Sequence, residues 1–212
     1  MSRNTGKPLV VAAPSGAGKT SLVRALVEST SNVKVAISHT TRPIRPDETD
    51  KLDYFFIDES RFLMMIDNHE FLEWARVFGS LYGTSKKEAD RIASSGSHLV
   101  LEIDWQGAAR VRDEIPHAIT IFILPPSLES LRERLQKRAQ DDQQTVEQRM
   151  NAAIDEISHY MEFDYLIVND DFDRALKEMS DVVNGKGEYL RQDRQNPELE
   201  RLISDLGCAA TE

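Results

Sequence analysis

The sequence predicts an α/β fold with a parallel-sheet core flanked by helices, an inserted α+β lobe and a short lid. Short apolar runs alternate with helical patterns, which is typical of a parallel sheet covered on both faces. A glycine-rich loop joins the first apolar run to the first helical pattern. Residues 38–97 interrupt the alternation with strand-like and helix-like runs of their own. This segment is too long for a simple connection, since most connections are shorter than about 12 residues.

The elements of the core follow from apolar runs and helix signals. The expected strands are Leu9–Ala12, Val33–Ser38, His98–Asp104, Ala118–Leu124 and Tyr165–Val168. The expected helices are Ser21–Val27, Gln106–Glu114, Ser127–Ala139, Val146–Met161 and Asp171–Val183. A capping box formed by Thr145 and Gln148 marks the start of the fourth helix.

Residues 38–97 are expected to form the inserted lobe, with strands at Asp53–Asp58 and Arg76–Tyr82 and helices at Ser60–Asn68 and Ser85–Ser94. Ser85 and Glu88 form a capping box for the second of these helices. Met64, Met65 and Trp74 are expected in the core of the lobe. Residues 1–37 and 98–183 would then form the core of a single domain. Residues 184–212 would form a tail that is helical in part, with Leu199, Leu202 and Ile203 on one face.

Charge and composition exclude several classes of partner. The chain has 212 residues and a formal net charge of −10, whereas a general nucleic-acid binder needs a basic surface. No stretch approaches the roughly 20 apolar residues that a membrane span needs. The single cysteine, Cys208, allows no intramolecular disulfide, which fits a reducing compartment. We therefore expect a soluble cytoplasmic protein without a nucleic-acid or membrane partner. Its oligomeric state is left open, with a homodimer as one option.

The stretch Ala13-Pro14-Ser15-Gly16-Ala17-Gly18-Lys19-Thr20 has the pattern of a phosphate-binding loop between a strand and a helix. Glycines let backbone N–H groups turn toward an anion, and a helix N-terminus adds free donors and a favourable dipole. Lys19 would reach the β- and γ-phosphates, and the Thr20 hydroxyl would bind Mg²⁺. Ala13 replaces the first glycine of the pattern. The alternative is a glycine-rich turn without a ligand.

Polar residues follow two of the expected strands. Arg42 and Arg45 come just after the second strand, at the edge where open α/β sheets bind ligands, and they suit bidentate contact with a phosphate. They could instead be solvated surface arginines. Glu102 and Asp104 close the third strand, where a carboxylate beside a phosphate loop commonly holds Mg²⁺. Asp104 could instead cap the helix that follows.

Three further arginines, Arg134, Arg138 and Arg149, lie in residues 134–150 around a polar stretch. Arg134 and Arg138 share a helix face because they are four residues apart. A basic segment of this kind could act as a lid that brings charge to a transferring phosphoryl group. A salt-bridged surface hairpin is the equally open alternative.

The chain resembles guanylate kinase over about residues 8–183. The resemblance rests on motifs in the family's order and spacing: Ser38-His39-Thr40-Thr41-Arg42-Pro43, Tyr54-Phe55-Phe56, Phe71-Leu72-Glu73-Trp74-Ala75, Tyr82-Gly83-Thr84, Ile103-Asp104-Trp105-Gln106-Gly107 and Val168-Asn169-Asp170-Asp171. It implies Mg²⁺-dependent transfer of the γ-phosphoryl group of ATP to GMP, giving ADP and GDP, in purine nucleotide metabolism.

The resemblance also implies roles for individual residues. The GMP phosphate would be held by Ser38, Arg42, Arg45, Tyr54 and Tyr82, and the guanine would face Glu73, Thr84 and Asp104, with Gly83 in the same motif. ATP would be bound by Pro14, Ser15, Gly16, Ala17, Gly18, Lys19, Thr20, Ser21 and Asn169. Lys19, Arg42, Arg134, Arg138 and Arg149 would be catalytic, and Thr20 and Glu102 would hold Mg²⁺, in part through water.

The chain departs from the family's pattern at three places. Glu102 stands where the family usually has aspartate, and the chain after Val183 is not covered by the resemblance. Lys137 and Ala139 replace two glycines around Arg138. Since glycine is about 1 kcal/mol less favourable than alanine in a helix, we expect helix through Arg138 and a flexible segment at 140–144.

The alternative functions are a non-catalytic binding module and a kinase of a phosphorylated sugar. Non-catalytic binding modules resemble guanylate kinase, but they typically have damaged phosphate loops, whereas this chain keeps Lys19 and Thr20. A kinase of a phosphorylated sugar would leave Glu73 and Thr84 without a base to contact. Adenylate kinase is less favoured, because its inserted lobe is helical.

Overall fold

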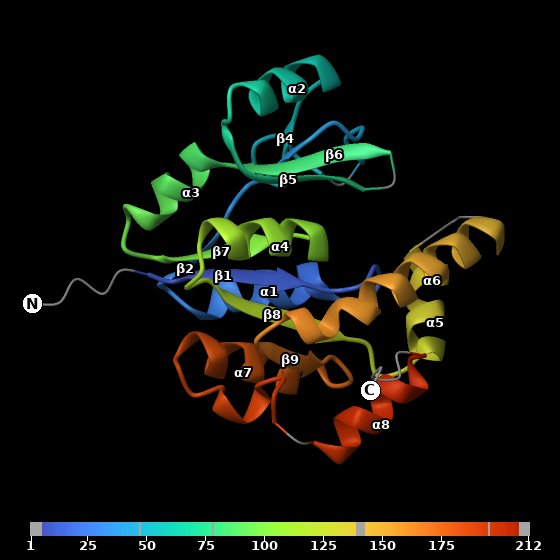
Figure 1. Cartoon of the computed structure of the whole chain (residues 1–212). Helices are drawn as coiled ribbons and strands as arrows, with labels where there is room; N and C mark the ends of the chain where they lie inside the picture. Colours follow the sequence, from blue (N-terminus) through green and yellow to red (C-terminus); the bar gives the residue numbers. More distant parts are fainter. Residues whose placement is uncertain (1–5, 47, 78, 139–142, 195, 208–212) are drawn as a thin grey trace, which may run out of the picture. The chain divides into compact units, whose positions relative to one another are not determined.

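The computed structural model describes residues 6–46, 48–77, 79–138, 143–194 and 196–207 (Figure 1). The chain forms two compact units, which we describe separately. The first unit comprises Met1–Val10 and Ser31–Ile119, and the second comprises Val11–Thr30 and Thr120–Glu212. The expected lobe, residues 38–97, falls within the first unit.

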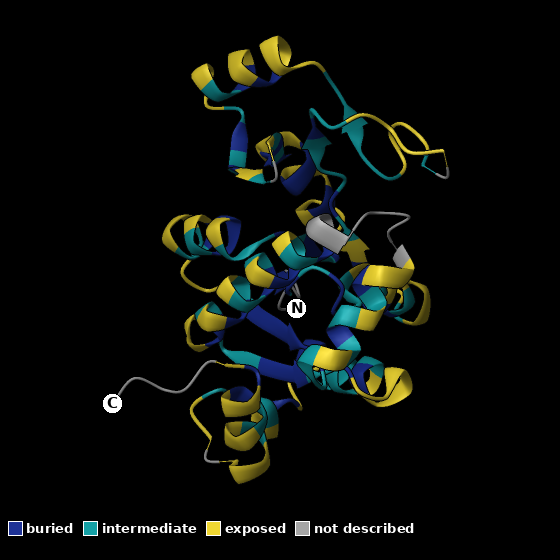
Figure 2. Cartoon of the chain, turned by 90° about the vertical axis from the view of Figure 1, so that its right-hand side faces the viewer, coloured by how far each residue is buried: buried dark blue, intermediate teal, exposed yellow. Residues whose placement is uncertain are grey.

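The larger sheet has five strands in the order β2-β7-β1-β8-β9. Its strands are β1 (Pro8–Ala12), β2 (Val33–Val35), β7 (His98–Glu102), β8 (Ile119–Leu124) and β9 (Tyr165–Val168). In the first unit β2 pairs with β7 in parallel, and in the second unit β8 pairs with β9 in parallel. Strands β1, β7, β8 and β9 are mostly buried, as near-continuous apolar runs require when helices cover a sheet (Figure 2), whereas Lys34 in β2 is exposed. The predicted α/β class with a parallel sheet is confirmed.

Helices and short 3₁₀ segments complete the two units. The first unit contains α2 (Glu59–Asp67), α3 (Lys86–Ala93) and α4 (Trp105–Glu114). The second contains α1 (Lys19–Ser29), α5 (Leu128–Arg138), α6 (Gln143–Ser158), η1 (His159–Glu162), α7 (Phe172–Val183), η2 (Glu188–Leu190) and α8 (Pro197–Asp205). Side-chain caps fix several starts: the Arg174 N–H donates to Asp171 at 2.8 Å, and the Glu88 N–H donates to Ser85 at 3.3 Å.

A second, four-stranded sheet lies in the first unit, in the order β4-β3-β6-β5. Its strands are β3 (His39–Thr40), β4 (Phe55–Phe56), β5 (Phe71–Val77) and β6 (Ser80–Ser85). Helix α2 packs on this sheet through a cluster of buried side chains: Phe62, Met65, Phe71 and Leu81. This segment is therefore an α+β structure, as the sequence suggested.

Three details of the first unit differ from the prediction. The expected strand Arg76–Tyr82 is instead a hairpin of β5 and β6, and Gly79 in the turn has a φ of 82°, which favours glycine. The expected strand Val33–Ser38 ends at Val35, and the chain then continues into β3 of the smaller sheet, which pairs with β6. Met64 is 46% exposed rather than buried, because the inner face of α2 presents Phe62 and Met65.

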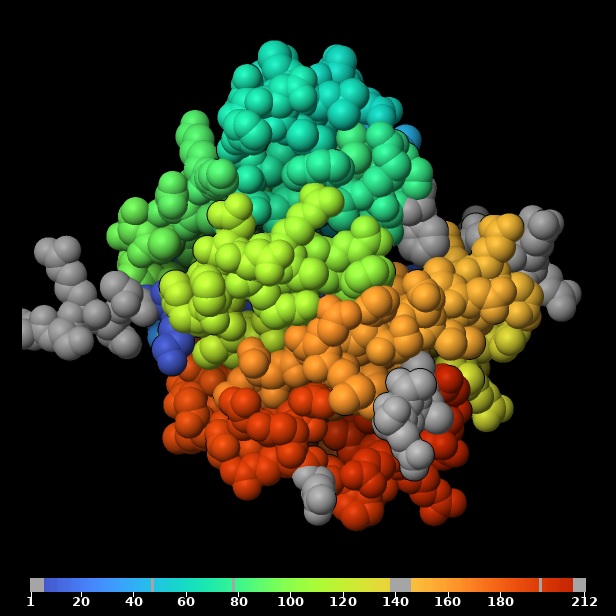
Figure 3. Space-filling model, viewed as in Figure 1, coloured from blue at the N-terminus to red at the C-terminus, as the bar shows by residue number. Residues whose placement is uncertain are grey.

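The segment of the expected lid consists of two helices in the second unit. Helix α5 continues to Arg138, as predicted from the missing glycines. Helix α6 begins at Gln143 rather than Val146, so the expected Thr145 capping box does not mark its start, and Gln143 and Gln144 are helical rather than flexible. Residues 139–142 lie outside the described part of the chain. In the space-filling view α6 lies at the surface along much of its length (Figure 3).

Candidate active site

The phosphate-binding loop has its expected position between β1 and α1. The Ala17 N–H donates to the Pro14 carbonyl at 3.0 Å, which closes a tight turn. Gly16 and Gly18 have φ values of 91° and 94°, a region that other residues rarely adopt. The two glycines are therefore required by the backbone, and Gly18 passes directly into the first turn of α1.

Two side chains of the second unit donate hydrogen bonds that hold this loop. Asn169, which is buried after β9, donates from Nδ2 to the Ala17 carbonyl at 2.7 Å. Arg134 on α5 donates from Nη1 to the same carbonyl at 3.3 Å and from Nη2 to the Asn169 carbonyl at 3.1 Å. A Cβ at Gly18 would lie 2.4 Å from Asn169 Nδ2, so only glycine fits there. Arg134 and Asn169 are thus brought together with the loop.

The remaining residues predicted to contact ATP occupy the first turn of α1. Lys19 is half-buried, whereas Thr20 and Ser21 are exposed. The positive end of a helix dipole lies at such an N-terminus, which suits a phosphate. A residue that the prediction missed, Glu156 on α6, accepts the Ser15 N–H at 2.9 Å. No local motif marks Glu156, because this contact joins residues far apart in the chain.

The other two predicted lid arginines lie on α5 and α6. Arg149 is half-buried on α6. Arg138 is the last residue of α5, and its side chain lies outside the described part of the structure. The two helices are joined by an ion pair between Arg132 and Glu147. A salt bridge of the kind expected for a surface hairpin is therefore present, but it uses none of the three predicted arginines.

In the first unit, the residues expected to face a guanine gather around a buried carboxylate. Glu73 on β5 is only 4% exposed, and its Oε1 accepts the Thr84 backbone N–H at 2.8 Å. The Thr84 hydroxyl lies 3.0 Å from the Ser38 hydroxyl. Glu73 and Thr84, which the sequence grouped at the guanine, thus lie together, whereas Ser38, which it grouped with the phosphate, contacts Thr84.

The charge of Glu73 is controlled by its surroundings. Burial raises the pKa of Glu73 to about 7, hydrogen bonds from Thr84 oppose this rise, and nearby Asp104 adds to it. The positive charge of Arg110 lowers the pKa of Glu73 slightly. A carboxylate with few competing partners in a dry site is a strong acceptor for paired N–H donors.

Asp104 has the capping position that the sequence left open as an alternative. Its Oδ1 accepts the Gly107 N–H at 2.7 Å at the start of α4. A Cβ at Gly107 would lie 2.9 Å from Glu73 Oε2, so both carboxylates approach the first turn of this helix. Capping uses one oxygen of Asp104, and no hydrogen bond to the other is formed within the part of the chain that the structure describes. Gly107 is a site residue that the prediction missed.

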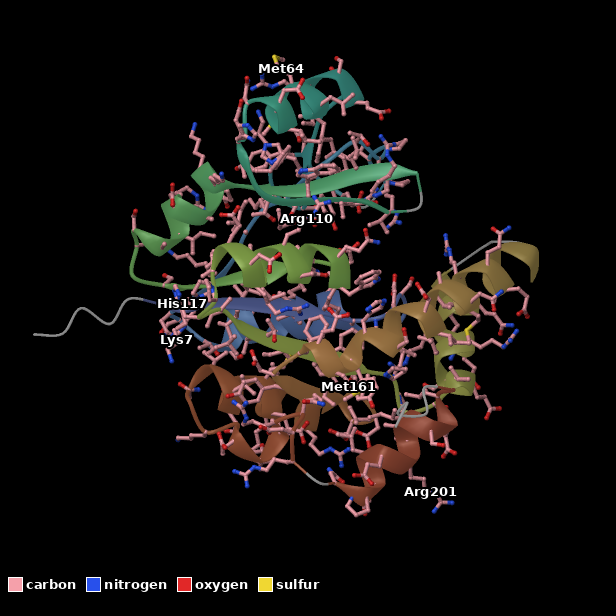
Figure 4. The ribbon with its side chains drawn as sticks, viewed as in Figure 1. Lys7, Met64, Arg110, His117, Met161 and Arg201 are labelled. Carbon is pink, nitrogen blue, oxygen red and sulfur yellow. The ribbon has the colours of Figure 1, made fainter. Side chains whose placement is uncertain are left out.

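Helix α4 is anchored to β5 beside Glu73. Arg110 Nη1 donates to the Trp74 carbonyl, and the guanidinium lies 4.3 Å from the centre of the Trp74 ring. Figure 4 shows Arg110 projecting from α4 toward β5. Arg110 thus fixes the strand residue that follows Glu73.

The residues expected to hold a phosphate form an aromatic and basic cluster. The Arg42 guanidinium lies 5.4 Å from the Tyr54 ring, and the Tyr54 and Tyr82 rings are 6.1 Å apart. Burial raises the pKa of Tyr54 to about 12, and nearby Glu102 contributes, so its hydroxyl remains a donor. Tyr82 and Thr84 are two residues apart on β6 and share a face of the sheet, with Gly83 between them. The structure brings Arg42, Tyr54 and Tyr82 together.

Glu48 lies within this cluster and was missed by the prediction. It pairs with Arg42 at 2.8 Å, and Arg45 Nη1 lies 3.8 Å from the same carboxylate. The hydrogen bond to Glu48 and, more weakly, the Tyr82 hydroxyl raise the pKa of Arg42. The only sequence signal is a carboxylate shortly after two arginines, which is common on surfaces.

Glu102 is the last residue of β7 and is half-buried. Within the described residues no group of three or more histidine, cysteine or acidic side chains could hold a metal ion by itself. Mg²⁺ bound with a nucleotide needs only one or two carboxylates, because phosphates and water supply the other ligands. None of the described helices has the length and apolar character to cross a membrane.

Known proteins are similar to this chain in sequence and fold. The family model described as guanylate kinase matches residues 5–186. A guanylate kinase of Coxiella burnetii is 50% identical over 203 residues, covering 96% of this chain and 98% of the relative. One of Methylococcus capsulatus is 51% identical over 197 residues, covering 93% and 96%. The crystal structure of guanylate kinase from Anaplasma phagocytophilum is 33% identical, with a TM-score of 0.73 over 95% of each chain.

Proposed function

Because the chain belongs to the guanylate kinase family and transfers a phosphoryl group from ATP to GMP, we propose which of its residues carry each part of this reaction. The first unit binds GMP through the Glu73 and Arg42 clusters. The second unit binds ATP through the phosphate-binding loop. The alternatives, a sugar-phosphate kinase and a non-catalytic binding module, are not favoured.

Guanine recognition is assigned to Glu73, with Thr84, Ser38 and Asp104 around it. The Watson–Crick edge of guanine offers N1–H and N2–H₂ as adjacent donors, and one carboxylate can accept both. Adenine has an acceptor at N1 and would not supply the Glu73 carboxylate, in its buried site, with the second donor that guanine offers. A buried polar group without a partner costs about 1–3 kcal/mol, so the site rejects AMP. The burial and hydrogen bonding of Glu73 is the observation that carries the assignment.

The GMP phosphate is assigned to the cluster of Arg42, Tyr54 and Tyr82, with Arg45 at its exposed edge. A guanidinium donates two parallel hydrogen bonds to a phosphate, and tyrosine hydroxyls donate one each. The rings of Tyr54 and Phe56 pack against Arg42 and limit its hydration. The cluster therefore offers fixed donors in a partly dry environment.

ATP is assigned to residues 14–21, with Lys19 on the β- and γ-phosphates. The backbone N–H groups of the loop and of the α1 N-terminus supply the donors. Asn169 and Arg134 keep the loop in shape through Ala17, and the family places Asn169 beside the adenine. Arg134, Arg138 and Arg149 would meet negative charge on the transferring group.

Mg²⁺ is proposed to accompany ATP, held by Thr20 and Glu102, the latter in part through water. A hydroxyl and a carboxylate are the hard oxygen ligands that this ion prefers, so the donor set fits. When bound, Mg²⁺ neutralises charge on the β- and γ-phosphates. We place the reaction in the purine nucleotide metabolism of the cytoplasm.

The chemistry needs no general base from this chain. The attacking oxygen belongs to a GMP phosphate that is already largely ionised at neutral pH, since its second pKa is about 6. The protein therefore contributes positioning and electrostatic stabilisation of the in-line transition state. Closure around both substrates would exclude water and suppress hydrolysis of ATP.

A panel of phosphoryl acceptors tests the assignment. ADP release would be measured with MgATP and GMP, AMP, CMP, UMP or ribose 5-phosphate, for the wild type and for Glu73→Gln. We expect strong preference for GMP in the wild type and loss of that preference in the variant. Equal preference for GMP in both proteins would remove Glu73 from the base site.

A further inference from the structure

The carboxylate of Glu48 lies between the two arginines assigned to the GMP phosphate. Arg42 Nη2 donates to Glu48 Oε1 at 2.8 Å, and Arg42 Nη1 donates to Oε2 at 2.9 Å. The backbone N–H of Arg45 donates to Oε2 at 2.9 Å. One carboxylate therefore accepts three hydrogen bonds from this segment, two of them from a guanidinium fork.

The fork occupies only one edge of the Arg42 guanidinium. Arginine has five N–H donors in a fixed plane. Glu48 takes one from each terminal nitrogen, and the Pro43 carbonyl takes the second from Nη1 at 2.7 Å. Glu48 and Pro43 leave Nε–H and the second N–H of Nη2, and the Tyr82 hydroxyl, which is itself assigned to the GMP phosphate, also interacts with this guanidinium. These two N–H donors lie on the same edge of the guanidinium, which is the second edge that can bind an oxyanion in a bidentate manner.

Burial distinguishes this pair from an ordinary surface salt bridge. The side chains of Arg42 and Glu48 are 14% and 13% exposed, and the Phe56 ring lies 5.6 Å from the Arg42 guanidinium. The hydrogen bond from Arg42 holds the pKa of Glu48 below its usual value. An ion pair of this kind fixes the orientation of both groups, whereas exposed pairs seldom do.

We propose that Glu48 is a positioning residue of the GMP site, which holds one edge of Arg42 so that the other edge faces the GMP phosphate. The inference rests on the proposed role of Arg42. Glu48 makes no contact with substrate and acts through Arg42 alone. The opposite reading is that Glu48 occupies the phosphate position and must be displaced by GMP. The carboxylate of Glu48 leaves the second edge of the guanidinium uncovered, and this argues for positioning.

Steady-state kinetics of Glu48→Gln separates these readings. Glutamine keeps the size of the side chain but turns an N–H₂ group toward the donors of Arg42. We expect KM for GMP to rise about tenfold, as for the loss of a hydrogen bond to a charged group, with kcat and KM for ATP within threefold. A fall in KM for GMP would mean that Glu48 competes with the phosphate, and would overturn the proposal.

Two further measurements keep the result interpretable. Glu59→Gln removes another carboxylate of the first unit, which pairs with Arg76 at 2.5 Å, and it should leave the KM for GMP unchanged. In an Arg42→Ala background, Glu48→Gln should change KM for GMP by less than twofold, because the residue through which it acts is gone. Additive effects in the double variant would overturn the proposal.

The proposal and the function on which it rests fail in different ways. If Arg42→Ala alone left KM for GMP unchanged, Arg42 would not bind the phosphate, and the assigned site would be wrong. If Arg42→Ala raised KM but Glu48→Gln lowered only the Tm, Glu48 would be structural and the positioning role would be refuted.

Discussion

Binding of the guanine base should depend on pH through the buried carboxylate of Glu73. Burial raises the pKa of Glu73 from its ordinary value of 4.5 to about 7. The charged and hydrogen-bonding groups around it are Thr84, Asp104 and Arg110. Only the ionised carboxylate can accept both N1–H and N2–H₂, so protonation removes the acceptor that guanine needs.

The expected magnitude follows from the fraction ionised. With a pKa near 7, about a tenth of Glu73 is ionised at pH 6 and about nine tenths at pH 8. Affinity for the base should therefore fall about tenfold from pH 8 to pH 6. The assay is calorimetric titration with guanosine, which lacks the phosphate, because the phosphate of GMP also titrates near pH 6.

The same shift predicts a stability effect of known sign. The folded protein binds a proton at Glu73 between pH 4.5 and about 7 that the unfolded chain has released, so stability falls as pH rises through this window. The total is about 3 kcal/mol, since one pKa unit corresponds to about 1.4 kcal/mol. In urea unfolding, the free energy of unfolding of the wild type should fall by this amount as pH rises through the window, relative to that of Glu73→Gln.

An affinity of the wild type for guanosine that is flat between pH 6 and pH 8 would refute the reasoning about Glu73.

Three substitutions test other residues of the proposed sites. Lys19→Ala should reduce kcat at least a hundredfold with a Tm within a few degrees, because we assign Lys19 to the phosphates of ATP. Activity within tenfold of the wild type would contradict this assignment. Gly107→Ala should raise KM for GMP severalfold, because the new Cβ would lie 2.9 Å from Glu73 Oε2. The Tm should change little, because alanine is about 1 kcal/mol more favourable than glycine in a helix. An unchanged KM would show that the Glu73 carboxylate is free to move. Arg110→Gln should move the midpoint of guanosine binding to higher pH, since the charge that lowers the Glu73 pKa is lost; a shift to lower pH would be inconsistent with this.

Much of the site was predictable because local sequence encodes it. The strand, glycine loop and helix around Lys19 need only neighbouring residues, and Gly16 and Gly18 have the positive φ values that the motif requires. The replacement of glycine by Lys137 and Ala139 predicted a helix through Arg138, which α5 confirms. Glu73 and Thr84 were expected together from the family's motifs, and the β5–β6 register pairs them.

The sequence by itself thus determined the α/β class, the parallel sheet and the identity of the phosphate-binding loop. Tertiary structure decided the rest: the hairpin at Gly79, the hydrogen bond from the Ser15 amide to Glu156, and the ion pair of Glu48 with Arg42. Hydrophobic periodicity and backbone conformation are properties of consecutive residues, and they leave a readable pattern. A contact between side chains depends instead on register, burial and which edge of a group is already occupied, and these are fixed only when the chain has packed.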